Sequence, residues 1–410
     1  MAKIDDSVKK KVPELRFKGF TDDWEERKLG ELSNIVGGGT PSTSNSEYWD
    51  GDIDWYAPAE IGEQRYVSKS KKTITELGLK KSSARILPVG TVLFTSRAGI
   101  GNTAILGKEA TTNQGFQSIV PNPNKLDSYF IYSRTNELKR YGEVTGAGST
   151  FVEVSGKQMS KMSIMIPELS EQKKIGSFFE QLDNTIALHQ RKLDKLKQLK
   201  QGYLQQLFPK PGETVPKIRF ANFEGEWEER KLRTLLIKNS KKNKDLTIKN
   251  VESISNRTGF TKQTEQFDEY SVASADLSNY YVITEQQFAY NPSRINVGSI
   301  AYKPIGDDTS VVSPLYVSFS TKKILNDSFL WNWFKTSSFE NQRQRLSEGG
   351  VRDTLSFNQL SEMSIVIPQY LEQVKIGNFF KQLDFLITLH QEKLKQLKTC
   401  KKALLQKMFI

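Results

Sequence analysis

The chain has 410 residues, 37% of them hydrophobic, which is enough for about two to four domains with packed cores. Lysine and arginine number 59 against 47 aspartates and glutamates, a formal net charge of +12 that favours a phosphate-bearing partner over ordinary solubility charge. A single cysteine excludes an intrachain disulfide, residues 1–11 lack the apolar core of a secretory signal, and no apolar run approaches the roughly 18 residues of a membrane span. We therefore expect a cytoplasmic protein without a membrane association.

The first recognisable element is a short segment, residues 12–32, that returns at residues 215–235. Both copies contain Val-Pro, Arg-Phe and the hexapeptide Trp-Glu-Glu-Arg-Lys-Leu, at a constant offset of 203 residues. About 12 of the 21 positions are identical, which indicates an internal duplication. This segment opens each copy of the repeat.

The stretch that follows, residues 33–162, has the mixed pattern of an α+β module. β-Branched and apolar residues predict strands at 89–95 and 117–120, and residues 128–141 are predicted to be helical. The sequence Gly-Gly-Gly-Thr-Pro at 37–41 predicts an open loop.

Three motifs resemble catalytic signatures only by their letters. Residues 37–40 lack the Gly-Lys-Ser/Thr of a phosphate loop, and residues 99–104 fit G-x-G-x-x-A without an evident βαβ unit. Residues 291–294 resemble the Asn-Pro-Pro-aromatic signature of aminomethyltransferases but lack the second proline and the aromatic residue. We interpret all three as turns. Because zinc-ligand spacing, a nuclease cluster and a catalytic triad are also missing, we expect no catalytic residue, metal or cofactor on this chain.

A long helix is predicted over residues 170–208, with Ser170 as a candidate N-cap and Pro209 as the terminator. At 1.5 Å per residue its length is about 57 Å. Apolar residues recur in alternating steps of four and three, the heptad pattern of a coiled-coil seam. The predicted seam positions are Leu182, Ile186, His189, Leu193 and Leu196, and in the second copy Leu383, Ile387, His390, Leu394 and Leu397.

This helix belongs to a second duplicated segment. Residues 163–208 and 364–409 share about 26 of 46 positions at an offset of 201 residues, without an insertion. We expect the apolar stripes of the two helices to pack against each other. If a pseudo-two-fold axis relates the two halves of the chain, the helices pack antiparallel. We interpret the two seam histidines, the only ones in the chain, as polar positions that set the coiled-coil register, with a pH switch or a catalytic base as the alternative.

The second variable stretch, residues 236–363, is nearly as long as the first but barely resembles it. We predict strands at 298–302 and 310–319 and a helix at 329–345. A duplicated frame with two divergent modules indicates two related tasks on different targets. Neutral drift after duplication is the alternative, although drift would not spare the flanking frames so selectively.

Both modules carry side chains suited to base recognition near predicted turns. Arginine and lysine recognise guanine edges in the major groove, asparagine and glutamine recognise adenine edges, and surface lysines contact phosphates. For any single residue a solvated surface position is the simpler interpretation, so the hypothesis depends on the set. The candidate DNA-binding residues of the first module are Thr40, Ser42, Lys72, Arg97, Asn102, Asn113, Gln114 and Gln117. Those of the second module are Lys241, Asn291, Ser293, Arg294, Lys303 and Arg352.

Several longer motifs carry a resemblance to a known family. The first half contains Trp-Glu-Glu-Arg-Lys-Leu-Gly-Glu-Leu (24–32), Gly-Gly-Thr-Pro-Ser (38–42), Tyr-Trp-Asp-Gly-Asp-Ile-Asp-Trp (48–55), Leu-Phe-Thr-Ser-Arg-Ala-Gly-Ile-Gly (93–101) and Asn-Gln-Gly-Phe (113–116). Both halves contain Ile-Pro followed by Glu-Gln and Lys-Ile. Over essentially its full length, the chain thus resembles the specificity subunits of type I restriction–modification systems. The second module lacks Gly-Gly-Thr-Pro-Ser and Asn-Gln-Gly-Phe, so it resembles another subclass of recognition domain.

The resemblance implies an α+β protein with two target-recognition domains, residues 1–168 and 211–369, separated by long antiparallel spacer helices at 169–210 and 370–410. Each domain would recognise one half of a split double-stranded DNA target, and the helices would set the spacing and dock two modification subunits. S-adenosylmethionine on those subunits, and ATP and Mg²⁺ on two restriction subunits where these are present, would supply methylation, translocation and cleavage. The alternatives are a self-contained DNA methyltransferase or nuclease, and a coiled-coil scaffold without DNA specificity.

Overall fold

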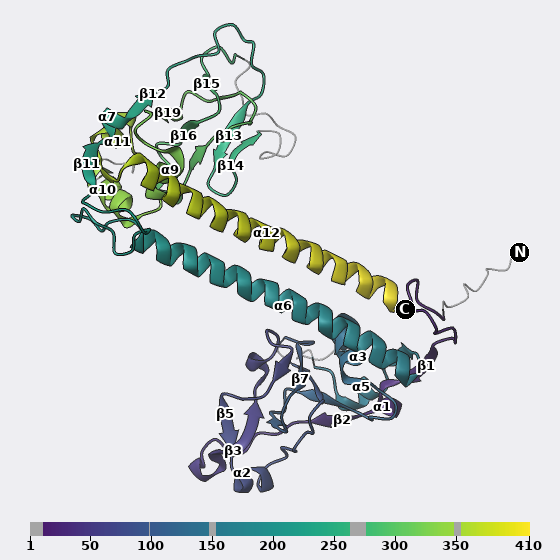
Figure 1. Cartoon of the computed structure of the whole chain (residues 1–410). Helices are drawn as coiled ribbons and strands as arrows, with labels where there is room; N and C mark the ends of the chain where they lie inside the picture. The colour runs from purple at the N-terminus through teal and green to yellow at the C-terminus, as the bar shows by residue number, and fades with distance from the viewer. Residues whose placement is uncertain (1–10, 98, 147–152, 263–275, 348–353) are drawn as a thin grey trace, which may run out of the picture. The chain divides into compact units, whose positions relative to one another are not determined.

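The computed structural model describes residues 11–97, 99–146, 153–262, 276–347 and 354–410 (Figure 1). The chain divides into two compact units: unit 1 is Met1–Gln190 with Glu392–Ile410, and unit 2 is Arg191–Gln391. Two long helices belong to both units. Helix α6 (Leu169–Gln206) begins in unit 1 and ends in unit 2, whereas α12 (Tyr370–Met408) begins in unit 2 and ends in unit 1.

Unit 1 contains a five-stranded sheet in the order β2–β9–β6–β7–β4 and a three-stranded sheet in the order β5–β3–β8. The larger sheet consists of β2 (Ser33–Gly37), β9 (Gln117–Pro121), β6 (Val92–Phe94), β7 (Thr103–Leu106) and β4 (Tyr66–Val67). The smaller sheet consists of β5 (Lys72–Ile74), β3 (Trp49–Tyr56) and β8 (Thr111–Thr112). Every residue of β6 and β7 is buried, so these apolar strands form the centre of the module.

Short helices and a two-stranded ribbon complete unit 1. The helices are α1 (Leu29–Leu32), α2 (Glu76–Lys80), α3 (Ser128–Ser133), α4 (Thr135–Gly146) and α5 (Gly156–Ser160), with 3-10 turns η1 (Ser46–Tyr48) and η2 (Pro58–Glu60). The ribbon pairs β1 (Glu25–Lys28) with β10 (Ser163–Ile166). Trp24, Phe130 and Phe179 are fully buried in one cluster, which joins the ribbon, α3 and the start of α6.

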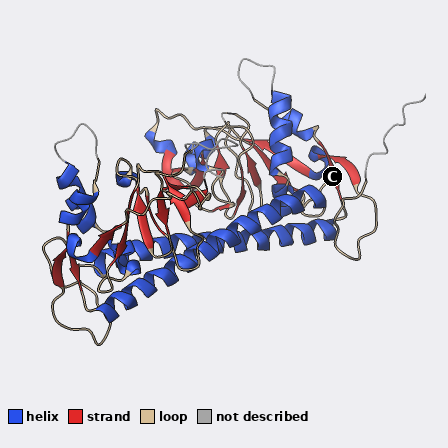
Figure 2. Ribbon diagram, turned by 90° about the horizontal axis from the view of Figure 1, so that it is seen from above, coloured by secondary structure: helices blue, strands red, loops and turns tan. Residues whose placement is uncertain are grey.

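Unit 2 contains a four-stranded sheet in the order β12–β19–β16–β17 and three two-stranded pairs, β13–β14, β15–β18 and β11–β20. Its strands are β11 (Glu228–Lys231), β12 (Leu236–Lys238), β13 (Glu252–Ser255), β14 (Gly259–Lys262), β15 (Tyr281–Ile283), β16 (Gln287–Tyr290), β17 (Ile300–Tyr302), β18 (Ser310–Val312), β19 (Val317–Thr321) and β20 (Ser364–Ile367). Its short helices are α7 (Leu232–Leu235), η3 (Ile295–Val297), α9 (Asp327–Trp333), α10 (Ser337–Ser347) and α11 (Phe357–Glu362). Figure 2 distinguishes the helices, in blue, from the strands, in red.

The two modules have the same strand order in their main sheets, although their sequences barely resemble each other. The order β2–β9–β6–β7 in unit 1 matches β12–β19–β16–β17 in unit 2, and each of these neighbouring pairs is antiparallel. The ribbons β1–β10 and β11–β20 match as well, residue by residue. The predicted α+β class with an internal duplication is confirmed, and the duplication extends into the divergent modules.

The glutamate of the repeated Glu-Gln motif at the start of each long helix binds the N-terminal segment of the same copy. Glu171 is fully buried, and both of its carboxylate oxygens accept hydrogen bonds from Arg16, at 2.7 Å each. In unit 2, Glu372 accepts from Arg219 at 2.7 and 2.8 Å. A bidentate guanidinium–carboxylate pair satisfies a buried charge with fixed geometry. The repeated motifs are therefore structural contacts that hold the N-terminal segment of each copy on its long helix.

The glutamine of the same motif anchors the module. Gln172 donates to the carbonyl oxygens of Lys125 and Pro167, and its own side-chain oxygen accepts from the backbone N–H of Asp127. Gln373 makes the same three kinds of bond in unit 2. Because Asp127 is also the N-cap of α3, one buried side chain links that helix to the start of α6.

The end of each long helix packs into the unit that does not contain its start. Phe208, at the end of the first copy, stacks on Phe380 and contacts Trp227 in unit 2. Phe409, at the end of the second copy, stacks on Phe179 and contacts Trp24 in unit 1. Within each unit, the start of one helix thus meets the end of the other, as in an antiparallel pair. No helix in the described part of the chain is long and apolar enough to span a membrane.

The predicted seam positions are all at least half-buried. Leu193, Leu383 and Leu394 are buried, and the other seven are half-buried. Leu182 packs against the core of unit 1, and Leu196 against that of unit 2.

Four predicted elements differ from the observed ones. The helix expected at 128–141 breaks at Arg134 into α3 and α4, and the helix expected at 329–345 breaks between Phe334 and Thr336 into α9 and α10. The strand expected at 310–319 is two strands, β18 and β19, because the chain turns at residues 313–316. Helix α6 begins at Leu169, so Ser170 lies in its first turn and is not its N-cap.

Candidate nucleic-acid interface

The loop after β2 is pressed against the strand ends of unit 1. A Cβ atom on Gly38 would lie 2.0 Å from the carbonyl oxygen of Asn113, and one on Gly39 would lie 2.4 Å from the backbone nitrogen of Ala84. Only glycine permits so close an approach. The indole N–H of Trp55 donates to the carbonyl oxygen of Gly39 at 2.8 Å, which fixes the loop from below.

This close packing brings four predicted residues of the first module together. The Thr40 hydroxyl donates to the side-chain oxygen of Gln114, which is exposed. Asn113 accepts a hydrogen bond from the N–H of Gly115 at 2.8 Å, so its side chain shapes the turn. The exposed Arg97 lies on the neighbouring segment, because the backbone of Ser96 bonds to both Gly115 and Val154.

Arg97 has an acidic partner on the same surface. Its Nε lies 2.8 Å from Glu153, and both side chains are partly exposed, at 46% and 35%. Since exposed ion pairs contribute little stability, this pair can open when a stronger acceptor approaches.

Ser42 and Lys72 form a second group around Trp49. The Trp49 indole N–H donates to the carbonyl oxygen of Ser42 at 3.1 Å, and the Lys72 ammonium lies 5.6 Å from the centre of the Trp49 ring. Trp49 also packs edge-on against Trp55, the residue that holds the glycine loop. The two aromatic rings therefore connect this group with Thr40.

Asn102 and Gln117 lie apart from these groups. Asn102 is exposed and faces Gly62, whose added Cβ would be 3.3 Å from its side chain. Gln117 is half-buried between Gly37 and Gly156.

The three-stranded sheet below these groups is stabilised by an internal carboxylate. Burial raises the pKa of Asp54, but the N–H and hydroxyl of Ser70 and the ammonium of Lys108 outweigh it, so that pKa lies below its ordinary value. The bonds are 2.8, 2.8 and 2.9 Å long. Asp54 is thus ionised at neutral pH and ties β3 to the segments on either side.

In the second module, three predicted residues share one loop. Asn291 accepts from the N–H of Ser293 at 3.0 Å, which closes a turn and leaves Ser293 and Arg294 exposed. Lys241 is also exposed, on the strand-like segment that bonds to Val282. Arg352 lies outside the described residues.

Lys303, by contrast, lies in the interior of unit 2. Its side chain is 1% exposed, and its ammonium lies 2.7 Å from Glu252 and 3.1 Å from the Ser310 hydroxyl. It also lies 4.8 Å from the centre of the Phe260 ring. An ammonium enclosed in this way is held by the fold, so Lys303 does not belong to the exposed surface of the module.

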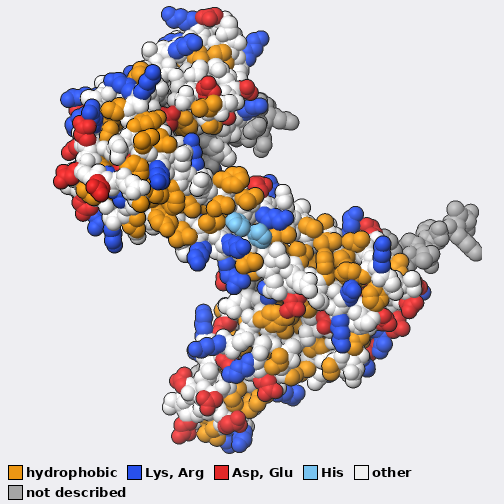
Figure 3. Space-filling model, in the orientation of Figure 1, with side chains coloured by type: hydrophobic (Ala, Val, Ile, Leu, Met, Phe, Trp, Pro, Cys, Tyr) orange, Lys and Arg blue, Asp and Glu red, His pale blue; other side chains and the backbone are white. Residues whose placement is uncertain are grey.

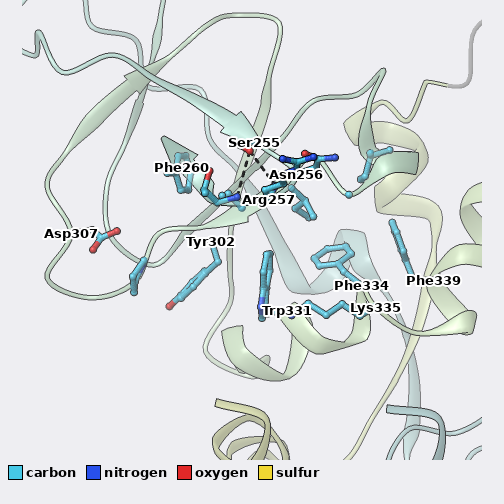
Figure 4. A pocket seen from close by; sticks show the side chains of 17 residues that line it. Ser255, Asn256, Arg257, Phe260, Tyr302, Asp307, Trp331, Phe334, Lys335 and Phe339 are labelled. Atoms are coloured by element: carbon cyan, nitrogen blue, oxygen red, sulfur yellow. Dashed lines mark hydrogen bonds between the residues drawn. The ribbon is translucent and has the colours of Figure 1, made fainter. Parts of the chain in front are cut away.

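A cavity of about 660 Å³ adjoins the Asn291–Ser293–Arg294 loop (Figure 4). It lies between the β13–β14 hairpin turn, the segment 295–304 and the α9–α10 helices. Figure 4 shows Tyr302, Trp331 and Phe334 on one wall and the turn residues Asn256 and Arg257 opposite.

The exposed turn residues Asn256 and Arg257 are additions that the sequence alone did not suggest. The signal for them is weak: a turn of three residues, Asn-Arg-Thr, between two strands of four residues each. Among the described residues, His, Cys, Asp and Glu nowhere form a group that could hold a metal ion.

Comparison with known proteins identifies the family. The type I restriction modification DNA specificity domain matches the chain twice, at residues 21–198 and 224–399. The MjaIX specificity subunit of Methanocaldococcus jannaschii is 39% identical over 167 residues, which are 40% of this chain and 39% of that protein. The EcoR124I/EcoR124II specificity subunit of Escherichia coli is 30% identical over 215 residues, 49% of this chain and 52% of that protein. The chain thus spans about two-fifths to one-half of these relatives.

A solved structure extends the likeness to the fold of the whole chain. The S subunit of a type I restriction–modification system from M. genitalium has a TM-score of 0.63 and 14% identity, and covers 97% of this chain and 99% of its own. At this identity the likeness shows the fold alone. With both halves matched, the chain belongs to the family of type I restriction–modification DNA specificity domains.

Proposed function

We propose that this chain is the non-catalytic, DNA-recognising specificity subunit of a type I restriction–modification complex. The observation that carries the proposal is the duplicated family domain, in which two modules share one sheet but present different surface loops. Two recognition modules with different surface loops on one chain fit a DNA target that consists of two different half-sites. The domain limits are proposed as 1–168 and 211–369, with spacer regions at 169–210 and 370–410.

The first module is proposed to recognise bases through the loop pair around Thr40 and Gln114. The hydrogen bond from Thr40 orients the Gln114 amide, which can then pair with an adenine edge in the major groove. Arg97 can leave Glu153 and contact guanine or a phosphate. Asn113 shapes the turn and is a supporting residue in this arrangement.

The second module is proposed to use the loop of Ser293 and Arg294 together with the hairpin turn at Arg257. The hairpin turn lines the cavity, Ile295 next to Arg294 lines it as well, and both arginines are exposed. Lysines on the module surfaces, including Lys72 and Lys241, would contact phosphates and position the DNA. Figure 3 shows many lysine and arginine side chains on the visible face, mixed with acidic ones.

The long helices are proposed to set the gap between half-sites and to dock two modification subunits. Several apolar side chains on α12 remain exposed: Leu371 at 70%, Phe385 at 67% and Leu389 at 52%. Apolar side chains that recur on one exposed helix are typical of a protein contact. S-adenosylmethionine on those subunits, and ATP and Mg²⁺ on two restriction subunits, would supply the chemistry, and the complex would act in the cytoplasm.

A module exchange tests the proposal. The full chain and a variant with residues 33–162 replaced by the module of another family member are each expressed with a modification subunit, and adenine methylation is mapped across the genome. We expect a two-part target for the original chain and a change in only one part for the variant. Changes in both parts, or a continuous target, would refute the two-reader arrangement.

A further inference from the structure

Two ion pairs link the long helices, one in each unit. In unit 1, the Lys401 ammonium lies 2.7 Å from Asp183, whose side chain is only 8% exposed. In unit 2, Lys200 pairs with Asp384. Each pair joins the start of one helix to the end of the other. A carboxylate so well shielded needs its partner, because an unpaired charge there would lose hydration without compensation.

The two pairs are equivalent positions of the duplication. Asp183 and Asp384 are separated by the repeat offset, and so are Lys200 and Lys401. The step from Asp183 to Lys200 along α6 equals the step from Asp384 to Lys401 along α12. A single antiparallel register therefore satisfies both pairs.

The apolar seam by itself does not select that register. Its leucines and isoleucines recur at heptad spacing, so a slip of seven residues places many apolar side chains against others of similar size. The same slip would move each lysine about 10 Å from its aspartate. Charged positions at a coiled-coil interface are a known means of excluding such slips.

In unit 1, the ion pair is also tied to the recognition module. Asp183 accepts a second hydrogen bond from the Tyr129 hydroxyl at 2.9 Å, and Tyr129 belongs to α3. Arg65 donates to Tyr129 at 3.2 Å and to Asn184, the next residue on α6, at 2.9 Å. One carboxylate thus contacts both the end of α12 and the recognition module.

We propose that the pairs Asp183–Lys401 and Lys200–Asp384 lock the helix register and thereby fix the gap between the two DNA half-sites. The four side chains are positioning residues that touch no base. The register lock concerns the chain alone, whereas its consequence for the gap rests on the proposed function.

Spin-label distances test the lock directly. Cys400 is exposed and is the only cysteine, so it takes one label, and the exposed Gln181 of α6, changed to cysteine, takes the other. Both positions lie in unit 1. The variant Asp183→Lys with Asp384→Lys opposes lysine to lysine in both pairs. We expect its distance distribution to broaden or to gain a second population, because a slip of one heptad displaces one label by about 10 Å along the helix axis relative to the other.

Charge exchange is the matched control. Adding Lys200→Asp and Lys401→Asp restores both pairs with reversed polarity, and the single original distance should return. An unchanged distribution in the double reversal, or a shift that the exchange does not reverse, would overturn the lock. Should the reversal not fold, Lys200→Gln with Lys401→Gln removes the lysine charge from both pairs without placing a new charge beside either aspartate, and an unchanged distribution there would equally overturn it.

Methylation mapping on the same variants separates the two claims. For the double reversal we expect a gap altered by about three base pairs, at 3.4 Å each, with both half-site sequences kept. If labels shift while the gap stays constant, the lock holds and its link to spacing is wrong. If the original chain directs no two-part methylation, the proposed function fails while the label result still decides the lock.

Discussion

The two modules have the same strand order and the same repeated flanking segments, but their surfaces are stabilised by different contacts. In unit 1 a glycine loop packs closely against the strand ends, and the nearby Asp54 carboxylate pairs with the partly exposed Lys108. Unit 2 has a hairpin over a cavity and holds the pair Lys303–Glu252 deep in the module. The duplicated contacts therefore position the sheet in each unit. The surface of each module is stabilised by ion pairs of its own and can vary independently of the other.

A few repeated side chains are enough to position the sheet in each unit. Arg16–Glu171 and Arg219–Glu372 use the same bidentate geometry, and Gln172 and Gln373 anchor their modules through the same three bonds. These contacts lie away from the loops proposed to recognise bases. Exchange of one surface therefore leaves the other module and the helix pair in place.

The largest expected effect concerns the buried pair of unit 2. Lys303→Met leaves the Glu252 carboxylate without its ammonium, and we expect unit 2 to lose about 3–5 kcal/mol of unfolding free energy. Denaturant unfolding measures this loss. The counterpart in unit 1, Lys108→Met, should have a small effect, because the Lys108 side chain is 59% exposed.

The same variant distinguishes a supporting lysine from a base-reading one. Adding Glu252→Gln to Lys303→Met should recover part of the lost stability, since no charge is then left unpaired. The DNA half-site should keep its bases in both variants. A Lys303→Met chain of normal stability with altered target bases would show that Lys303 recognises DNA after all.

The next effect separates the two surfaces by their DNA contacts. We expect Gln114→Ala and Arg294→Ala each to weaken binding by about 1–3 kcal/mol, roughly 5- to 150-fold, and only for the half-site of its own module. Titration of duplexes with one mutated half-site measures this. Gln64→Ala, an exposed glutamine of unit 1 outside the loop pair, is the control and should bind as the original chain does. Equal losses at both half-sites would contradict separate readers.

Sequence reasoning succeeded where a signal is long or repeated. The helices, the frame and the glycine loop follow from heptads, identities at a fixed offset and turn residues. It missed the common sheet, because strands of three to five residues carry too little periodicity once their sequences diverge. It also joined α9 to α10, since nothing in the pattern marks Thr336 as the cap of the second helix.

Site residues were harder to predict for a physical reason. A lysine before a turn suggests a surface position, yet Lys303 lies inside, opposite Glu252, a partner 51 residues away in sequence. Arg257 was missed because a hairpin turn becomes a candidate only when the fold shows that it lines a cavity, here one that Ile295, next to Arg294, also lines. The Thr40–Gln114 contact joins residues 74 positions apart. Pairings at such separations are properties of the fold, whereas the residue types alone follow from the sequence.

The smallest effect is a pH dependence confined to unit 1. The folded pKa of Asp54 lies below its unfolded value, because the bonds from Ser70 and Lys108 outweigh burial, so its contribution is fully present above the unfolded pKa, about 4. That contribution is lost as pH falls through the folded pKa. Unfolding free energies measured between about pH 6 and about pH 2 should fall more steeply for the original chain than for Asp54→Asn, and the two curves should converge in acid. The exposed neighbour Asp52→Asn is the control and should follow the original chain. Parallel curves for Asp54→Asn and the original chain would mean that the carboxylate contributes no pH-dependent stability.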